Sequence, residues 1–425
     1  MNPNSPGWRF AIAALIFVAA ICRWFPRPVQ GTVNNTGYEA LQVAYSLAHN
    51  HGFANPFEDL QSGPTAHLTP LFPLLLSGVI RCFGDGAHSL SIIIWMGVIT
   101  FGIQLSLWPF VAERLGMSFM AGVLAAGLWL FIGFLPGIPW EADYAAVLVI
   151  LITIGMYRIF RERCSTAYVA VSAVFWGVTI LTLPVVLMPF AIFALGVIFL
   201  SASTFRQKLV FVIVPLLLLV PWIIRNYVVF HHVVAVRDNL GMELGVSNNP
   251  CAKFSVMDNL AGCDIHPNRD YAEAQRLLVL GEYNYNHQRL REALDWIAGN
   301  PSQFIHLTVQ RTVAFWFPNH SGNPLTSRAG AKLVAYWVIT LVSIPGLLLL
   351  WWTNRTAAAI CLVWLVSFPP VYYLVQFDVR YRTPILWATM IPASYVIIRV
   401  VEKGSRWQGL RSLCQPSPDK LTGRT

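Results

Sequence analysis

Charged residues are scarce in this sequence. Only 12% of the 425 residues are Asp, Glu, Lys or Arg, whereas 56% are hydrophobic. A soluble domain usually carries about 25% charged residues, so the deficit excludes an ordinary water-soluble protein and indicates an integral membrane protein. The 16 Trp and 27 Pro agree with this, because Trp favours the headgroup level and Pro is tolerated in membrane helices.

Several motifs of soluble enzymes and pumps are missing. The sequence has no Walker loop, no GxGxxG fingerprint and no His-Glu-x-x-His, so a nucleotide-driven pump or a metalloprotease has no support. We interpret His49, His51 and His67 as hydrated loop residues without metal-ligand spacing, and expect neither a metal nor a cofactor. None of the seven cysteines forms a CxxC pair. Cys251 and Cys263 share one polar loop, where an oxidising compartment would allow a disulfide.

Long apolar runs predict an all-α polytopic membrane protein with about 10 transmembrane helices and further interfacial helices. Ten stretches are apolar and have the roughly 17 to 25 residues that a span needs. The first is predicted to be an anchor rather than a signal peptide, because Pro26, Arg27 and Pro28 follow it instead of a small-residue cleavage site. The ten stretches are residues 8–25, 88–111, 117–135, 139–158, 166–183, 185–201, 208–228, 333–352, 356–375 and 383–399.

The basic residues predict the orientation. With a cytoplasmic N-terminus, the short basic loops all fall inside, as the positive-inside rule requires. Residues 26–87 and 229–332 then form extracytoplasmic loops of a transmembrane domain over residues 1–400, and 401–425 form a cytoplasmic tail. The larger loop holds nine basic and nine acidic residues, so the net charge of +9 marks orientation and no nucleic-acid partner is expected. The short loops contain Arg158, Arg161, Arg163, Arg206, Lys208, Arg355, Arg399, Lys403, Arg406 and Arg411.

The two extracytoplasmic loops are predicted to contain helices. Apolar residues from Tyr38 to Ala48 recur at helical spacing, with Gly52 as a stop. A pattern over residues 270–298, interrupted at Gly281, predicts amphipathic helix, and Asn300 with Pro301 predicts the start of another. Leu68–Phe83 is short for a span and suits an interfacial helix; as a span it would move residues 26–67 to the cytoplasm.

Arginines where apolar runs end are candidates for phosphate binding. Arg225 and Asn226 follow one apolar run, and Arg237 comes shortly after. Arg380 and Arg382 lie in the turn between the last two predicted spans. Guanidinium presents a fork of donors that stays charged in a partly dry pocket, which suits a phosphate. Such residues also pair with carboxylates or bind headgroups, and this alternative stays open.

The candidate bases are Glu39, Glu141 and Asp143. Glu39 opens the predicted loop helix, while Glu141 and Asp143 lie at the mouth of the fourth predicted span. A carboxylate at a membrane helix end faces a cavity or a partner if it is not simply hydrated. Two alternatives stay open: Thr36-x-x-Glu39 also matches a capping box, and the other two acids also fit a water-exposed helix end.

Several short segments resemble those of the GT-C superfamily of membrane glycosyltransferases. The superfamily includes dolichyl-phosphate-mannose protein mannosyltransferases of glycosyltransferase family 39 and lipid A aminoarabinose transferases. The resemblance covers nearly the whole chain except about the last 20 residues, and it assigns Leu68–Phe83 to the first extracytoplasmic loop. The matching segments are Pro221-Trp222-x-x-Arg225-Asn226-Tyr227, Gly63-Pro64-Thr65-Ala66, Pro70-Leu71-Phe72-Pro73, Arg380-Tyr381-x-x-Pro384 and Gly281-Glu282.

The resemblance implies a glycosyltransferase of a multi-pass cell membrane, the inner membrane in a bacterium. It implies transfer of a sugar from a polyprenyl-phosphate donor to a lipid, glycan or protein acceptor on the extracytoplasmic side, with inversion at the anomeric carbon. Family members open the first loop helix with an Asp, and Thr36 stands here instead. Glu39 is then the lead base, with Glu141 in reserve, and Arg225 or Arg380 the lead cation.

Two other classes of function fit the sequence. A transporter or flippase of a lipid-linked substrate would use the same helices and charges, but the sequence shows neither a repeated half nor a charge pair at mid-span. The absent Asp also favours a non-catalytic relative that acts in envelope assembly.

Overall fold

Helices are the main secondary structure in the part of the chain that is described, and no β-sheet is found there. The computed structural model describes residues 6–133, 137–318 and 327–413, so the last residues of the predicted tail lie outside it. It contains 18 α-helices and two 3-10 helices. The predicted all-α class is therefore confirmed.

A bundle of mostly apolar helices makes up the larger part of the molecule. Each of the ten predicted spans overlaps a helix or a helix pair of this bundle. The bundle consists of α1 (Pro6–Arg23), α4 (Ala87–Arg114), α5 (Phe119–Ile132), α6 (Glu141–Arg161), α7 (Thr166–Ile180), η1 (Pro184–Val186) with α8 (Leu187–Leu200), α9 (Phe205–Phe230), α15 (Arg328–Thr353), α16 (Arg355–Ser367) with α17 (Pro370–Leu374), and η2 (Val379–Ile385) with α18 (Trp387–Leu413).

Among the described residues, five helices are long and apolar enough to cross a membrane. A sixth is added if η2 and α18, which are bent by 69° to each other, count as one span. Shorter apolar helices cover other predicted spans, namely α5, α7 and η1 with α8. These features indicate a multi-pass membrane protein, and the count of ten stays a prediction. The five are Ala87–Arg114, Glu141–Arg161, Phe205–Phe230, Ala329–Thr353 and Arg355–Leu374.

The two predicted loops contain the remaining helices. The break at Gly281 is confirmed, because this residue has a φ of +73° and separates α12 from α13. Asn300 is the N-cap of α14, but its side chain donates to the Trp296 carbonyl instead of capping the helix. The loop helices are α2 (Glu39–Ala48), α3 (Leu71–Phe83), α10 (Leu240–Ser247), α11 (Val256–Gly262), α12 (Tyr271–Leu280), α13 (Glu282–Gly299) and α14 (Pro301–Trp316).

Helix α3 does not have the length of a span. Its 13 residues rise only about 20 Å, against the roughly 30 Å of a hydrocarbon core. The helix packs against α2 and leaves Leu74 and Leu75 exposed. An interfacial position, as the sequence predicts, explains both its length and its exposed apolar side.

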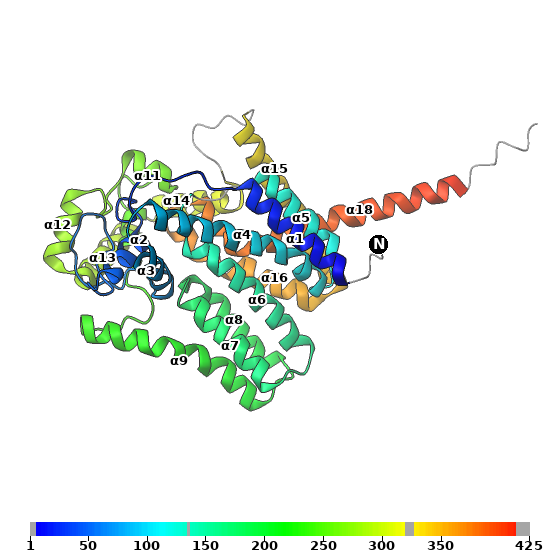
Figure 1. The fold of residues 1–425 in the computed structure, drawn as a ribbon, viewed down its shortest axis with the longest axis horizontal. Helices are drawn as coiled ribbons and strands as arrows, with labels where there is room; N and C mark the ends of the chain where they lie inside the picture. Colours follow the sequence, from blue (N-terminus) through cyan, green and yellow to red (C-terminus); the bar gives the residue numbers. More distant parts are fainter. Residues whose placement is uncertain (1–5, 134–136, 319–326, 414–425) are drawn as a thin grey trace, which may run out of the picture.

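The two loops lie at the same end of the bundle and contact each other. Figure 1 shows α2, α3, α12 and α13 together at one end, while α18 extends from the other. The Glu282 carboxylate accepts hydrogen bonds from the Thr65 hydroxyl and, at 2.6 Å, from the Ala66 amide. The amide of Glu58 donates to Asn268 Oδ1 at 3.1 Å. We call this joint structure, residues 26–87 and 229–318, the cap.

A disulfide joins Cys251 to Cys263, with 5.5 Å between their Cα atoms. The bond closes a loop around α11. The same loop is held to the bundle by a parallel β-bridge between Ser255 and Phe377. The segment before Arg380 is therefore in direct contact with the disulfide loop.

Candidate functional site

The cap and the bundle enclose a cavity of about 440 Å³. Four predicted site residues line it: Glu39 from α2, Glu141 from α6, Arg237 from the segment before α10, and Arg380 from η2. These residues come from segments far apart in the sequence. The cavity is therefore a product of the tertiary fold.

Glu141 is the centre of a hydrogen-bonded group. Its Oε2 accepts from the Tyr38 hydroxyl at 3.0 Å, and its Oε1 lies 3.5 Å from Arg237 Nη1. Arg237 also donates through Nε to the His67 carbonyl at 2.9 Å. The carboxylate of Glu141 is thus held by a neutral donor and by a cation, and these contacts orient it.

Arg380 is held flat against an aromatic ring. Its guanidinium carbon lies 3.2 Å from the centroid of Trp140, and its Nε lies 3.6 Å from Asp378 Oδ2. The ring of Tyr38 also packs against Trp140, with 4.3 Å between the ring centroids. A stacked guanidinium is restricted in rotation, so the fork of Arg380 is held in place before any ligand arrives.

Glu39 is the first residue of α2, and the N-cap is Tyr38. The capping-box alternative is therefore wrong, because the Thr36 hydroxyl donates to the Val33 carbonyl and accepts from the Tyr38 amide. The Glu39 side chain is 18% exposed. Burial raises its pKa to about 7, with Glu243 adding to the rise and Arg380 opposing it. A carboxyl group with this pKa is suited to general-base catalysis near neutral pH.

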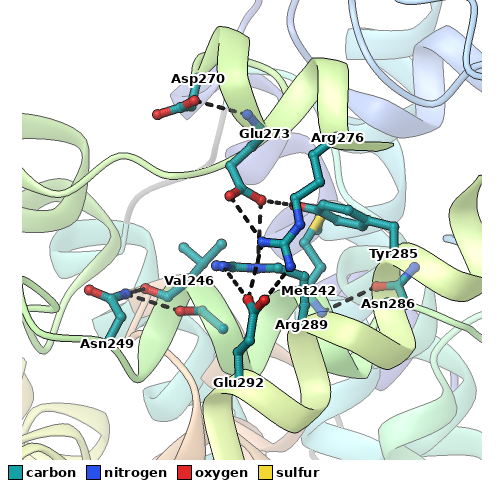
Figure 2. A network of polar contacts seen from close by, with 11 residues as sticks. Met242, Val246, Asn249, Asp270, Glu273, Arg276, Tyr285, Asn286, Arg289 and Glu292 are labelled. Carbon is teal, nitrogen blue, oxygen red and sulfur yellow. Dashed lines mark hydrogen bonds and ion pairs between the residues drawn. The ribbon is translucent and has the colours of Figure 1, made fainter. Parts of the chain in front are cut away.

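Glu243 of α10 adds a further carboxylate to the cavity. Burial raises its pKa, against the effect of Arg237 and Arg380. Helix α10 packs on α13, and the Met242 amide donates to Asn286 Oδ1 at 3.2 Å. Figure 2 shows this contact beside a network of charged residues.

The network ties α12 to α13 behind α10. Arg276 pairs with Glu292, and Arg289 Nη1 lies 3.3 Å from Glu292 Oε2. The Tyr285 hydroxyl donates to Glu273 at 2.6 Å, and Glu273 also faces both arginines (Figure 2). Partly buried charges of this kind need several partners at once to offset their desolvation. The network therefore stabilises one arrangement of the helices that support α10 and its Glu243.

Two predicted phosphate ligands do not line the cavity. Arg225 donates to the carbonyls of Phe53 at 2.7 Å and Thr65 at 2.6 Å, and to Asn226 Oδ1 at 2.9 Å. Asn226 is fully buried and donates to the Val234 carbonyl. Both side chains therefore donate hydrogen bonds to backbone carbonyls of the cap and fix its position on α9.

Arg382 and Asp143 also lie outside the cavity lining. Arg382 is 2% exposed and donates to the Trp316 carbonyl and to the hydroxyls of Thr340 and Thr389. Asp143 accepts from the Trp140 amide at 2.9 Å and so caps the start of α6. These contacts account for both side chains without a ligand.

His67 is not a hydrated loop residue. It is 3% exposed and lines the cavity, and burial together with Arg237 lowers its pKa well below the usual value. His51 is exposed, and His49 lies 3.2 Å from Asp85. Within the described residues, no group of three or more His, Cys, Asp or Glu is arranged to hold a metal ion.

Several cavity residues carry no signal that a sequence pattern could detect. Glu243, His266 and Asp264 line the cavity beside Glu39, yet none belongs to a motif or to a helical repeat. Asp378 and Tyr38 lie close in sequence to predicted residues. They become part of the site only through their contacts with Arg380 and Glu141. The nearest available indication is the density of polar residues from Arg237 to Asn249.

The cavity has separate ion pairs and two remaining carboxylates. Its pairs are Arg237 with Glu141, Arg380 with Asp378, and Arg269 with Asp264. In the described part of the chain, no Lys or Arg forms an ion pair with Glu39 or Glu243. The arrangement can therefore bind an anionic group near the arginines and accept a proton at Glu39.

Comparison with known proteins shows a similarity of fold to solved structures. No protein-family model matches this chain, and no curated protein matches it. Among solved structures, it is similar to the Archaeoglobus fulgidus oligosaccharyltransferase, crystallised as a complex with Zn and sulfate, with a TM-score of 0.51 and 12% identity over 96% of this chain. The match covers 52% of that enzyme, so this chain spans about half its length.

Two structures of ArnT from Cupriavidus metallidurans, one bound to undecaprenyl phosphate and one apo, give TM-scores of 0.36 and 0.34. Each is 13% identical over 92% of this chain, with 78% and 77% of ArnT covered. The oligosaccharyltransferase is a GT-C membrane glycosyltransferase, so the resemblance to this superfamily is confirmed at the level of the fold.

Proposed function

We propose that this protein is a membrane-bound glycosyltransferase that moves a sugar from a polyprenyl-phosphate donor to a hydroxyl group of a lipid, glycan or protein acceptor. The observation that supports it most is the cavity itself. Two carboxylates, Glu39 and Glu141, and two arginines, Arg237 and Arg380, converge there from four separate segments. Transfer from a phosphodiester needs a base for the acceptor and cations for the leaving phosphate.

In the proposed reaction, Glu39 takes the proton of the acceptor hydroxyl while the oxygen of that hydroxyl attacks the anomeric carbon. The bond between that carbon and the phosphate oxygen breaks, and the electron pair leaves with the polyprenyl phosphate. The leaving group gains one negative charge, which Arg237 and Arg380 stabilise. Because a single displacement occurs, the anomeric configuration inverts.

The distribution of exposed apolar surface agrees with a lipid donor. The helices of the bundle carry many exposed large hydrophobic residues, whereas the cavity lies where they meet the polar cap. A polyprenyl phosphate would place its phosphate at headgroup level and its chain along the helices. Arg225, Asn226, Arg382 and Asp143 support the cap and the helix ends in this proposal and do not touch the donor.

The test uses membranes that contain the full chain and a panel of radiolabelled polyprenyl-phosphate sugars. We expect label to enter the lipid, glycan or protein fraction. Glu39→Gln should reduce this transfer at least 100-fold, while Asp295→Asn, on the exposed side of α13, should leave it unchanged. If Glu39→Gln stays active and Glu141→Gln is inactive, Glu141 is the base.

The pH dependence gives a second measure of the same base. The pKa of Glu39 is about 7 because of its burial, and only the ionised carboxylate accepts a proton. Transfer should therefore fall about tenfold for each pH unit below 7 and level off above it. A wild-type protein that transfers no label from any donor at any pH would instead favour the non-catalytic relative, as the Thr36 position suggests.

A further inference from the structure

The segment between α11 and α12 forms the wall of the cavity beside Glu39. Asp264, His266 and Arg269 of this segment line the cavity. Asp264 and Arg269 pair with each other at 2.9 Å, so they brace the segment at both ends. His266, between them, faces the first residue of α2.

The tautomer of His266 follows from its contacts. Its Nδ1 accepts a hydrogen bond from the Asn268 amide at 3.1 Å, so in the neutral ring the proton is on Nε2. Nε2 lies 3.9 Å from Glu39 Oε1. This distance is longer than a hydrogen bond, and contacts of this kind in a site without its substrate often tighten when substrate binds.

Asn268 fastens this segment to the first loop. Its Nδ2 lies 3.4 Å from Glu39 Oε1 and 3.4 Å from the Gly37 carbonyl, and its Oδ1 accepts from the Glu58 amide. His266 also has an edge contact with Phe57, with 5.6 Å between centroids. Two neutral donors of the large loop are thus directed at one oxygen of Glu39.

We propose that His266 and Asn268 are positioning residues that direct their N–H groups at the Glu39 carboxylate and hold it ionised and oriented toward the acceptor. The contacts stand on their own, and only their consequence for transfer rests on the proposed function. A hydrogen bond to the charged form of a carboxyl group favours that form. The large loop therefore completes the base that the first loop supplies.

Other groups also act on Glu39. Glu243 of α10 and Glu141 of α6 raise its pKa by repulsion, and Arg380 of η2 lowers it. His266 contributes no charge near neutral pH, because burial and Arg269 lower its pKa to about 4. The carboxylate is consequently surrounded by more negative than positive charge. Neutral hydrogen-bond donors stabilise the Glu39 carboxylate there. The arginines therefore stay available for the phosphate of the sugar donor.

The experiment follows the Glu39 carboxyl group by isotope-edited infrared difference spectroscopy across pH, with the band assigned by its loss in Glu39→Gln. This readout needs no substrate. His266→Leu introduces an apolar side chain of similar bulk that has no hydrogen-bond donor, whereas His266→Gln keeps an N–H near the position of Nε2. His306→Leu, on the exposed face of α14, is the matched control.

We expect the titration of Glu39 to move upward by about one pH unit in His266→Leu, and to stay near the wild-type midpoint in His266→Gln and in the control. Asn268→Ala should move it in the same direction. At pH 6 the rate of transfer should fall about tenfold in His266→Leu and recover at pH 9, because one unit corresponds to a factor of ten.

An unchanged midpoint in both His266→Leu and Asn268→Ala overturns the inference, whether or not the protein transfers sugar. A shifted midpoint with no transfer by the wild type leaves the inference standing and rejects the proposed function. If His266→Leu does not fold, the comparison of His266→Gln with Asn268→Ala decides in the same way.

Discussion

Arg225 and Arg380 both lie where the cap meets the bundle, but their contacts give them different roles. Arg225 places its donors on two backbone carbonyls of the first loop. Arg380 lies against Trp140 and lines the cavity. A sequence motif contains the residue type and its approximate position, but not the direction of the guanidinium. The lead cation for the phosphate in this proposal is therefore Arg380, with Arg237.

Lysine substitutions should separate the two roles. Arg380→Lys keeps the charge but loses the fork and the planar stacking, so transfer should fall by roughly 100-fold while the protein stays folded. Arg225→Lys leaves at least one carbonyl of the first loop without a donor, and should lower the free energy of unfolding by about 1 to 3 kcal/mol. Thermal unfolding in detergent and transfer per folded molecule measure both effects.

Arg291→Lys, on the exposed side of α13, is the control for a change of arginine to lysine. A variant Arg225→Lys that unfolds like the wild type and yet transfers no sugar would return Arg225 to the donor site.

At the scale of single elements, most of the helices could be predicted because hydrophobic periodicity and helix breakers act locally. Gly281 separates α12 from α13, as the pattern predicts, because its φ of +73° suits glycine. The capping-box alternative at Thr36 is wrong, since Thr36 bonds back to Val33 and leaves Tyr38 as the N-cap. Such a choice depends on neighbours distant in sequence, here Glu141, which accepts from Tyr38.

Helix α10 depends on close packing against α13. At Gly241 an added Cβ would overlap the carbonyl oxygen of Asn286. Gly241→Ala should therefore separate the two helices and destabilise the cap by about 1 to 3 kcal/mol. It should also disturb Glu243 and raise protease sensitivity in residues 240–300. Limited proteolysis with mass spectrometry measures this change.

Gly299→Ala is the matched control, because a Cβ at that position of α13 meets nothing within 4 Å. The packing argument fails if both alanine variants resist protease equally.

At the scale of the whole molecule, contacts between the loops restrict the number of membrane crossings. Glu282 bonds to Thr65 and Ala66, so the two loops lie on the same side of any membrane. An even number of spans must therefore separate them. Of the intervening helices, α4, α6 and α9 qualify by length and composition, and three is odd. One or all three of the shorter helices α5, α7 and η1–α8 must also cross.

The sequence predicts that all three cross, which gives six spans between the loops and places both loops outside. Single cysteines in a background without Cys22, Cys82, Cys164, Cys361 and Cys414 test this, because the disulfide of Cys251 with Cys263 leaves no other thiol among the seven. In intact cells, a membrane-impermeant maleimide should label Gln61→Cys and Gly299→Cys, which replace exposed residues of the two loops.

Arg163→Cys, between α6 and α7, replaces a residue that is also exposed, and it should react only after the membrane is opened, since the basic short loops face the cytoplasm. Equal labelling of Gln61→Cys and Arg163→Cys in intact cells would contradict the topology. Labelling of Gln61→Cys without labelling of Gly299→Cys would contradict the placement of the two loops on one side of the membrane, on which the cavity depends. The proposed site needs Glu39, Arg237 and His266 in one compartment, and their reaction with an outside acceptor requires that compartment to be extracytoplasmic.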